Sequence, residues 1–455
     1  MTLTIDDLRY LAVSLPSDIA AYKYNGDFDG ELDAIKQYLS RKGLPHALRM
    51  RLELEAMIAR SVRNNYTMSS DDALKELQKT CPPLTAEDIE RFVDAGWVDH
   101  IRRNGRVYFE NSAVTNILRT HKGLLHELTN PGEKLPPPES AALRHETIER
   151  QHNFGYDAVR FTVEAALRPA DGCLRPGETC YIHLPFPAVT PEQSEIALLE
   201  SSHPVTLSPE SSPIRTAHIA APLEKDEWAK IRYTYVNRAD YIPPDDGAVS
   251  PEQPDFYTGE TYPHIRFTPL IRALADELSA GTDNPLVKAR RAYLLITEHV
   301  MYSYVRPYRD IDNLAEYPLL EGHGDCGIQA LLFITLCRCM GIPARWQSGM
   351  APSFTDIGSH DWALFYVAPF GWLHCDPSYG GGAFRRGDIL MREHYFGNLD
   401  PFRMVSCTDF QRDFDPPRRF MRDDPYDNQS GEAEYADAPV ESVRFTRKVV
   451  SAERV

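Results

Sequence analysis

The amino-acid sequence predicts a multidomain α+β protein, and three observations lead to this prediction. First, the chain has 455 residues, which is too long for one ordinary hydrophobic core and suggests about three domains. Second, residues 1–130 carry mostly helical spacing of apolar residues, whereas residues 151–245 carry short alternating segments. Third, residues 265–390 combine a buried helix with a pair of strands. We therefore expect a helix-rich N-terminal domain, a small β-sandwich and an α+β core.

The composition is that of a globular, acidic chain. Hydrophobic residues make up 42% and charged residues 25% of the sequence, and 66 acidic against 49 basic residues give a formal net charge of −17. This balance argues against nucleic acid or an anionic membrane as the main partner. The first residues lack the basic segment and apolar run of a signal peptide, and no stretch of about 18 uncharged apolar residues occurs. We expect a soluble protein of the cytoplasm.

The end of the N-terminal domain carries a hairpin signal. Residues 97–110 alternate as a strand pair does, and Asn104-Gly105 supplies the two positive-φ residues of a tight turn. A helix followed by such a hairpin is typical of a winged-helix layout, which binds DNA or protein or only packs. The arginines near the turn stand beside Asp99 and Glu110, as in a solvated turn, so nucleic-acid binding is disfavoured.

Composition marks the boundaries of three further regions. Residues 131–150 begin with a Pro-rich run that predicts a stiff, extended linker. Residues 151–245 contain alternating segments separated by Pro, Gly and Ser clusters, which is typical of a small β-sandwich. Residues 391–455 mix polar and aromatic residues without a clear period, and we expect them to pack on the core and to cover part of its cleft.

A cysteine opens the most apolar helix of the sequence. Asp325 is a good N-cap residue, and apolar residues follow it at helical spacing until Gly341 and Pro343 end the pattern. Cys326 is therefore expected in the first turn of a buried helix. Unpaired N–H groups and the positive end of the helix dipole favour a thiolate there, and so a nucleophile. Taken alone, such a cysteine is more often a small apolar residue of a capping turn.

Two downstream residues favour the interpretation of Cys326 as a nucleophile over that of an apolar capping residue. Residues 359–367 and 372–376 predict two strands joined by a tight turn. Antiparallel pairing of these strands would bring His360, near the start of one, close to Asp376, at the end of the other. An imidazole oriented by a carboxylate is the general base that a thiol nucleophile needs.

Three strings of the sequence resemble the core of the transglutaminase-like superfamily, which includes transglutaminases, peptide N-glycanases and many bacterial cysteine hydrolases. They are GDCGIQALLFITLCRCMGIPAR, HDWALFYVAPFGW and HCDPSYG, and the resemblance covers residues 285–380. It implies that Cys326 is the nucleophile, His360 the base and Asp376 the acid that orients the base. It also implies a papain-like core, in which the Cys helix packs on an antiparallel sheet.

The resemblance also draws attention to aromatic residues upstream of the cysteine. Family members often carry an aromatic or amide side chain there that helps the Cys backbone N–H to hold an oxyanion. Tyr302, Tyr304 and Tyr308 are candidates for this role, and the motif singles out none of them. Tyr302, Tyr304 and Trp362 are also candidates for substrate binding, and simple packing explains the tyrosines equally well.

The triad requires no metal or cofactor. Eight cysteines are too few for a disulfide scaffold in a chain of this length, and we expect them to be reduced. A zinc site from Cys337, Cys339, His374 and Cys375 is disfavoured, because the paired Cys-x-x-Cys spacing of structural zinc is absent. No acidic loop of EF-hand type occurs, so the calcium dependence of animal transglutaminases is not carried over.

The resulting hypothesis is an enzyme that attacks a peptide or carboxamide carbonyl and forms a thioester on Cys326. Water as the acceptor makes it a peptidase or amidase, and an amine makes it an acyltransferase or transglutaminase. The sequence decides neither the acceptor nor the oligomeric state. The alternative is a catalytically idle module that binds a peptide or protein in the same cleft, and the intact Cys, His and Asp set argues against it.

Overall fold

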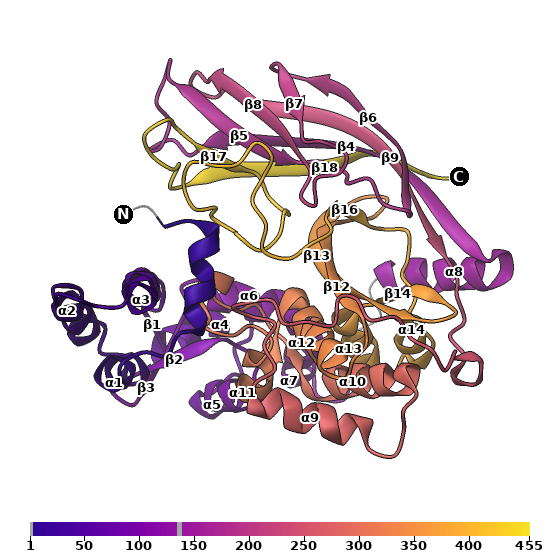
Figure 1. Ribbon diagram of the computed structural model, residues 1–455, viewed down its shortest axis with the longest axis horizontal. Coiled ribbons are helices and arrows are strands. Elements are labelled where there is room, and N and C mark those ends of the chain that lie inside the picture. The colour runs from indigo at the N-terminus through magenta and orange to yellow at the C-terminus, as the bar shows by residue number, and fades with distance from the viewer. Residues whose placement is uncertain (1–2, 134–138) are drawn as a thin grey trace.

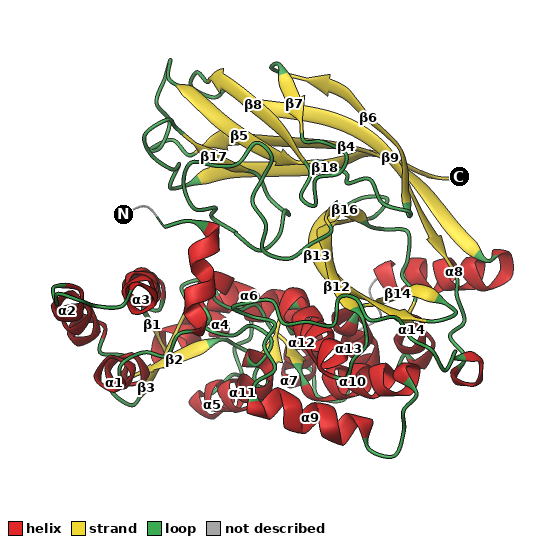
Figure 2. Cartoon of the chain, in the orientation of Figure 1, coloured by secondary structure: helices red, strands yellow, loops and turns green. Residues whose placement is uncertain are grey.

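The computed structural model describes residues 3–133 and 139–455, and its strands and helices occupy separate layers (Figures 1 and 2). A β-sandwich forms one side of the molecule, and a layer made mainly of helices forms the other (Figure 2). The strands of the core sheet lie between the two (Figure 1). The prediction of a mixed α+β protein is confirmed, and it is built from several sheets.

Residues 3–133 form helices around a small three-stranded sheet of order β1-β3-β2. The turn between the second and third strands has positive φ at Asn104 (49°) and Gly105 (78°), so the predicted hairpin is present. The elements are η1 (Ile5–Ala12), α1 (Ser17–Asn25), α2 (Phe28–Leu39), α3 (His46–Asn65), β1 (Met68–Ser69), α4 (Ser70–Gln78), α5 (Ala86–Asp94), β2 (His100–Arg103), β3 (Arg106–Phe109), α6 (Ala113–Thr120) and α7 (Lys122–Thr129).

The first N-terminal helices pack directly into the core of the protein. Leu8, Leu54 and Ile58 belong to the same buried cluster as the helix that begins at Cys326. Residues between Ala73 and Leu125 instead form a separate cluster of their own. A third, smaller cluster contains Ile19, Ile35, Leu52 and Ala56. Of these three clusters, only the first joins the N-terminal helices to residues far along the chain.

A helix, α8 (Glu139–Phe154), follows where the sequence predicts an extended linker over residues 131–150. Residues 134–138 of that prediction lie outside the described part of the chain. Along α8, Thr147 and Gln151 are fully buried, and Gln151 Nε2 donates hydrogen bonds to the carbonyls of Ala239 and Leu399. Contacts with two other regions thus hold this segment as a helix, which its own composition did not indicate.

Two four-stranded sheets form the β-sandwich. One has the order β18-β4-β9-β6 and the other β17-β5-β8-β7. The sequence analysis assigned residues 391–455 to a segment on the core, but β17 and β18 pair with β5 and β4 and complete the sandwich. The strands are β4 (Tyr156–Pro169), β5 (Thr179–Pro185), β6 (Gln193–Ser201), β7 (Val205–Leu207), β8 (Thr216–Pro222), β9 (Ala229–Asp240), β17 (Glu432–Glu434) and β18 (Val443–Arg454).

The core is an antiparallel five-stranded sheet, of order β15-β14-β13-β12-β16, with helices packed on it. Its strands are β12 (Ala344–Pro352), β13 (Ile357–Val367), β14 (Gly371–Cys375), β15 (Phe396–Gly397) and β16 (Met404–Cys407). The other elements are η2 (Asp246–Ala248), α9 (Pro269–Ser279), α10 (Pro285–His299), β10 (Met301–Tyr302), η3 (Tyr308–Asp310), α11 (Tyr317–Glu321), β11 (His323–Gly324), α12 (Cys326–Cys339), α13 (Pro377–Arg386) and α14 (Ile389–His394).

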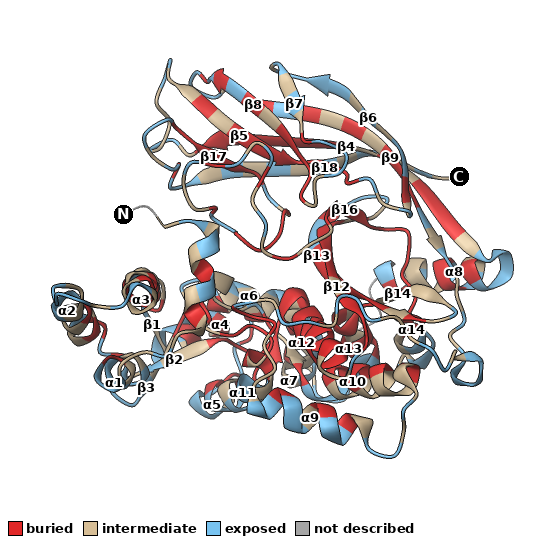
Figure 3. Cartoon of the chain, viewed as in Figure 1, coloured by how far each residue is buried: buried red, intermediate tan, exposed pale blue. Residues whose placement is uncertain are grey.

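Helix α12 is the centre of this core, and every residue from Cys326 to Arg338 is buried (Figure 3). Asp325 caps the helix by accepting a hydrogen bond from the backbone N–H of Ile328 at 3.2 Å. Phe333 packs edge-on against Phe365 of β13, with ring centroids 5.5 Å apart. A helix that is apolar on all sides has to be surrounded by other elements, and here the sheet and the four helices α9, α10, α11 and α13 surround it.

Helix α13 approaches α10 closely through a glycine. A Cβ atom on Gly380 would lie 1.9 Å from the hydroxyl oxygen of Tyr293. That hydroxyl is itself fixed, because it donates a 2.6 Å hydrogen bond to the carbonyl of Arg392. The glycine run of residues 380–382 thus forms part of a helix. The missing side chain at Gly380 lets the backbone of α13 approach Tyr293 of α10 closely.

We expect Gly380→Ala to destabilise the protein by about 1–3 kcal/mol, because the new methyl group overpacks against a fixed, buried tyrosine. Gly382→Ala is the matched control in the same helix, where the nearest atom is the flexible Nη1 of Arg386 at 3.3 Å. The control should gain up to about 1 kcal/mol from the higher helix propensity of alanine. Urea unfolding measures both, and equal effects of the two substitutions would contradict the expectation.

Candidate active site

His360 and Asp376 meet at the ends of two paired strands. β13 and β14 are antiparallel, with Ala363 opposite Cys375, and Asp376 directly follows β14. His360 Nε2 lies 2.7 Å from Asp376 Oδ2. Both side chains are buried. The structure therefore brings together two of the three residues that the sequence analysis selected.

Asp376 is held by four groups. Its Oδ1 accepts hydrogen bonds from the backbone N–H of Tyr379 (3.0 Å) and from Ser378 Oγ (2.9 Å), so it also caps α13. Its Oδ2 faces His360 and forms an ion pair with Arg403 Nη2 at 3.0 Å. Burial alone would raise the pKa of Asp376, but the charges of His360 and Arg403 outweigh burial and lower it. Asp376 is therefore a carboxylate at neutral pH.

The imidazole of His360 is positioned as a neutral base. Burial lowers the pKa of His360, and the attraction of Asp376 opposes this only in part. An ionised carboxylate can only accept hydrogen bonds, so the proton of the neutral ring lies on Nε2 and Nδ1 carries the lone pair. The ring is stacked on Tyr379, with centroids 4.3 Å apart. These contacts fix both the tautomer and the orientation of the ring.

Cys326 opens α12, and its sulfur contacts a residue that the sequence analysis did not select. Cys326 Sγ donates a hydrogen bond to Asp361 Oδ2 at 3.2 Å. Asp361 follows His360 in β13, and neighbouring residues of a strand point to opposite faces of a sheet. Among the described residues, no hydrogen bond joins Cys326 to His360. The thiol contact and the His–Asp contact thus lie on different sides of β13.

The surroundings of Cys326 favour the protonated thiol over the thiolate. Burial raises the pKa of Cys326 well above its usual value, and the carboxyl groups of Asp361 and Asp325 raise it further. A backbone hydrogen bond from Asp361 acts in the opposite direction but is a smaller effect. In this conformation, desolvation and two acidic neighbours outweigh the helix dipole on which the expectation of a thiolate rested.

A loop of residues 408–431, which joins β16 to β17, covers the Asp361 side of the site. Gln429 Nε2 donates a hydrogen bond to Asp361 Oδ1 at 2.5 Å. Burial, and then the charges of Asp325 and Asp424, raise the pKa of Asp361 well above its usual value. This loop, which we call the covering loop, therefore places further acidic groups near Cys326.

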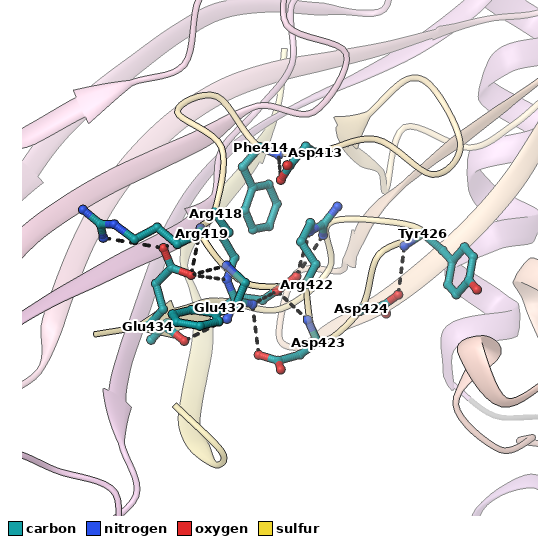
Figure 4. Close-up of polar contacts among 12 residues, drawn as sticks. Asp413, Phe414, Arg418, Arg419, Arg422, Asp423, Asp424, Tyr426, Glu432 and Glu434 are labelled. Atoms are coloured by element: carbon teal, nitrogen blue, oxygen red, sulfur yellow. Dashed lines mark hydrogen bonds and ion pairs between the residues drawn. The ribbon is translucent and has the colours of Figure 1, made fainter. Parts of the chain in front are cut away.

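Buried ion pairs anchor the covering loop to the sandwich (Figure 4). Glu432 of β17 accepts hydrogen bonds from Arg422 Nε (3.0 Å) and Nη2 (2.9 Å) and pairs with Arg418 Nη1. Arg418 Nε also pairs with Glu434 at 3.3 Å. All four side chains are at most 5% exposed. The two arginines thus fix the loop to a strand of the sandwich.

The tyrosines named as candidates take different positions. Burial, and then the neighbouring Cys326 and Asp325, raise the pKa of Tyr302 well above its usual value, so its hydroxyl stays protonated beside Cys326. Tyr304 packs edge-on against Tyr302, with centroids 6.0 Å apart, and is exposed. The hydroxyl of Tyr308 donates a hydrogen bond to Asp325 Oδ1. The Cys326 thiol helps to raise the pKa of both Tyr302 and Tyr308, but the hydroxyl of Tyr308 is already engaged with Asp325.

Trp362 is fully buried, so it does not present an open surface to a substrate. Its Nε1 donates a 2.8 Å hydrogen bond to Gln347 Oε1, and the guanidinium of Arg403 lies 5.2 Å from its ring centroid. The residues considered for zinc are also dispersed: Cys375 belongs to the buried core cluster, whereas His374 Nε2 faces Glu192 at 3.8 Å. Within residues 3–133 and 139–455, no group of three His, Cys, Asp or Glu side chains is arranged to hold a metal ion.

Sequence reasoning did not select Asp361, Arg403 or Gln429. Asp361 carried a usable signal, because a residue next to His360 in a strand has to point to the opposite face, where the Cys helix packs. Arg403 and Gln429 lie in segments without a regular period, and only the tertiary fold brings them to the site.

We expect iodoacetamide to label Cys326 slowly near pH 7 and faster as the pH rises, because its raised pKa keeps it a thiol. Asp361→Asn removes a carboxyl group that raises the pKa of Cys326 and should lower that pKa, and a tenfold rise in the thiolate fraction gives a reaction that is about tenfold faster. Asp356→Asn changes an exposed residue just before β13 and is the control. Peptide mapping by mass spectrometry measures the rates, and an unchanged rate in Asp361→Asn would contradict the role of its carboxyl group.

Glu432→Gln should destabilise the protein by about 3–5 kcal/mol, because it leaves two buried guanidinium groups without their main counter-charge. Glu441→Gln changes an exposed glutamate a few residues away and should cost less than about 0.5 kcal/mol. Urea unfolding compares the two variants. A loss below about 1 kcal/mol in Glu432→Gln would show that the buried ion pairs do not anchor the covering loop.

No described helix has the length and apolar character needed to cross a membrane. Comparison with curated proteins gives no significant match. Among solved structures, a candidate cysteine protease from Cytophaga hutchinsonii is similar with 14% identity and a TM-score of 0.42, over 66% of this chain and 91% of that one. The periplasmic domain of TgpA from Pseudomonas aeruginosa is similar with 16% identity and a TM-score of 0.29, over 51% and 92%.

These similarities are too low to assign a function. The family comparison is more specific, because the model of the transglutaminase-like superfamily matches residues 272–377. That range contains Cys326, His360 and Asp376, together with α12 and the strands β12 to β14. Residues 272–377 therefore form a domain of the transglutaminase-like superfamily.

Proposed function

We propose that the protein is a thiol-dependent enzyme that transfers or hydrolyses an acyl group at a peptide or carboxamide carbonyl. The observation that supports this most directly is the 2.7 Å contact between His360 Nε2 and Asp376, which orients a neutral base. Cys326 supplies the nucleophile at the start of a buried helix, as in the family that its domain belongs to. No step requires a metal or a cofactor.

The reaction begins when His360 Nδ1 takes the proton of the Cys326 thiol. The thiolate attacks the carbonyl carbon, and the oxyanion is held by the backbone N–H at the start of α12 and by the hydroxyl of Tyr302. The C–N bond then breaks, the amine leaves with the proton from His360, and a thioester remains on Cys326. Attack by water gives a carboxylic acid, and attack by an amine gives a new amide. Either step restores the thiol.

The first step requires a change in the resting site. Cys326 donates a hydrogen bond to Asp361 in the structure, and its sulfur has to leave this partner before His360 can act as its base. Gln429 of the covering loop holds Asp361 in place. We therefore propose that substrate entry rearranges the Cys326 side chain and the contact with the covering loop.

The second candidate is a catalytically idle module that binds a peptide or protein in the same cleft. The contact of Cys326 with Asp361 favours it, because it raises the pKa of the thiol without engaging His360. Neither candidate uses nucleic acid or a membrane. The cytoplasmic location stays a prediction from the sequence.

A panel of peptide amides and glutamine-containing peptides, with and without a primary amine, tests the enzyme. We expect release of ammonia or amine, and a covalent acyl-enzyme on Cys326 by intact-mass spectrometry. Cys326→Ala should abolish both, and His360→Ala and Asp376→Asn should lower the rate by at least about a hundredfold. His374→Ala, a histidine on the neighbouring strand outside the triad, is the control. Peptide binding with equal affinity in all variants and no turnover would support the idle module.

A further inference from the structure

A second pocket lies between the sandwich and the core sheet. Its volume is about 200 Å³, and it is enclosed by the end of β9 on one side and by β12, β13 and β14 on the other. Cys326 and Asp361 are not among its lining residues. The pocket is therefore separate from the site at the start of α12.

The wall of this pocket contains arginine N–H groups that have no partner. Arg345 lies 4.5 Å from the ring centroid of Trp372, and its Nε is buried without a hydrogen bond. Within the described part of the chain, no carboxylate forms an ion pair with Arg345. Arg403 is 2% exposed, and its Nε and Nη1 also lack partners. Unpaired buried donors are costly, and guanidinium groups bind carboxylates best.

The wall also carries carboxylates: Asp240 and Asp400 are already paired with Arg238 and Arg403, and Glu192 is a fixed acid. Glu192 Oε1 accepts a 2.7 Å hydrogen bond from Gln347 Nε2, and Gln347 in turn accepts one from Trp362. Burial would raise the pKa of Glu192, but contacts with His374 and Gln347 lower it to about 2. Glu192 is therefore ionised at neutral pH, and it is suited to receive a positive group.

Apolar side chains complete the pocket. Trp372, Leu364, Leu399 and Ile242 lie among the polar groups. A ligand that fits has to offer an anionic head to the arginines and an apolar body to these side chains. Small ligand sites commonly combine apolar walls with a few placed polar groups in this way.

We propose that this pocket binds a small molecule or chain end that carries a carboxylate on an apolar body, such as an amino acid of leucine or phenylalanine size. Arg345 and the free N–H groups of Arg403 hold the carboxylate. Two sources share this chemistry: a free amino acid, whose ammonium group would reach Glu192, and the C-terminal residue of a peptide, which has no such charge. This inference does not depend on catalysis by Cys326.

Calorimetric titration of the full protein tests the proposal with N-acetyl-L-phenylalanine and its neutral isostere N-acetyl-L-phenylalaninamide. The acid should bind at least about tenfold more tightly than the amide. Arg345→Gln should remove this difference. Arg238→Gln is the matched control, because Arg238 also lines the pocket but is already paired with Asp240 at 2.7 Å. Thermal unfolding checks that both variants are folded.

Three results would overturn the proposal. They are equal binding of the acid and the amide, no binding of either at millimolar concentration, or an equal loss of affinity for the acid in Arg345→Gln and Arg238→Gln. L-phenylalanine distinguishes the two sources. Tighter binding of the free amino acid than of the acetylated acid, lost in Glu192→Gln, assigns the pocket to a free amino acid. Tighter binding of the acetylated acid assigns it to a peptide C-terminus.

Discussion

The carboxylate of Asp376 is the point at which several parts of the structure meet. One oxygen caps α13, and the other receives His360 and Arg403. Four partners around one buried charge allow it to stay ionised in a place where an isolated carboxylate would take up a proton. The orientation of His360, the start of α13 and the position of Arg403 at the second pocket therefore depend on a single side chain.

β13 divides the chemistry of the core between its two faces. His360 belongs to the face that carries Asp376, Tyr379 and Arg403, where the charges are balanced and the pKa of Asp376 is lowered. Asp361 belongs to the face of α12, where acidic groups gather around Cys326 and each raises the pKa of the others. The proposed mechanism assigns proton transfer to the first face, whereas the second face keeps the thiol protonated. The two have to cooperate for Cys326 to act as a nucleophile.

The elements that carry the site were predictable from the sequence because their signals are local. Asp325 and the apolar spacing after it indicated α12, and the aromatic and β-branched residues around His360 indicated β13. The contact of His360 with Asp376 followed from the pairing of adjacent strands. The contact of Cys326 with Asp361, and the burial that raises the thiol pKa, depend on how the helix and the covering loop pack on the sheet. No local pattern encodes that packing. β17 was not predictable for the same reason. In the sequence its glutamates resemble loop residues, and only the folded structure places Arg418 and Arg422 beside them.

The pairing of β18 with β4 sets the order in which the chain is able to fold. Val443 lies opposite Pro169, so the whole core sheet is synthesised between the two halves of one strand pair. While the polypeptide emerges from the ribosome, β9 is available to one side of β4 early, but the other side stays open until β18 appears. An unpaired, apolar strand edge is a template for wrong pairing. This edge of β4 is therefore open to wrong pairing from the synthesis of Pro169 until that of Val443.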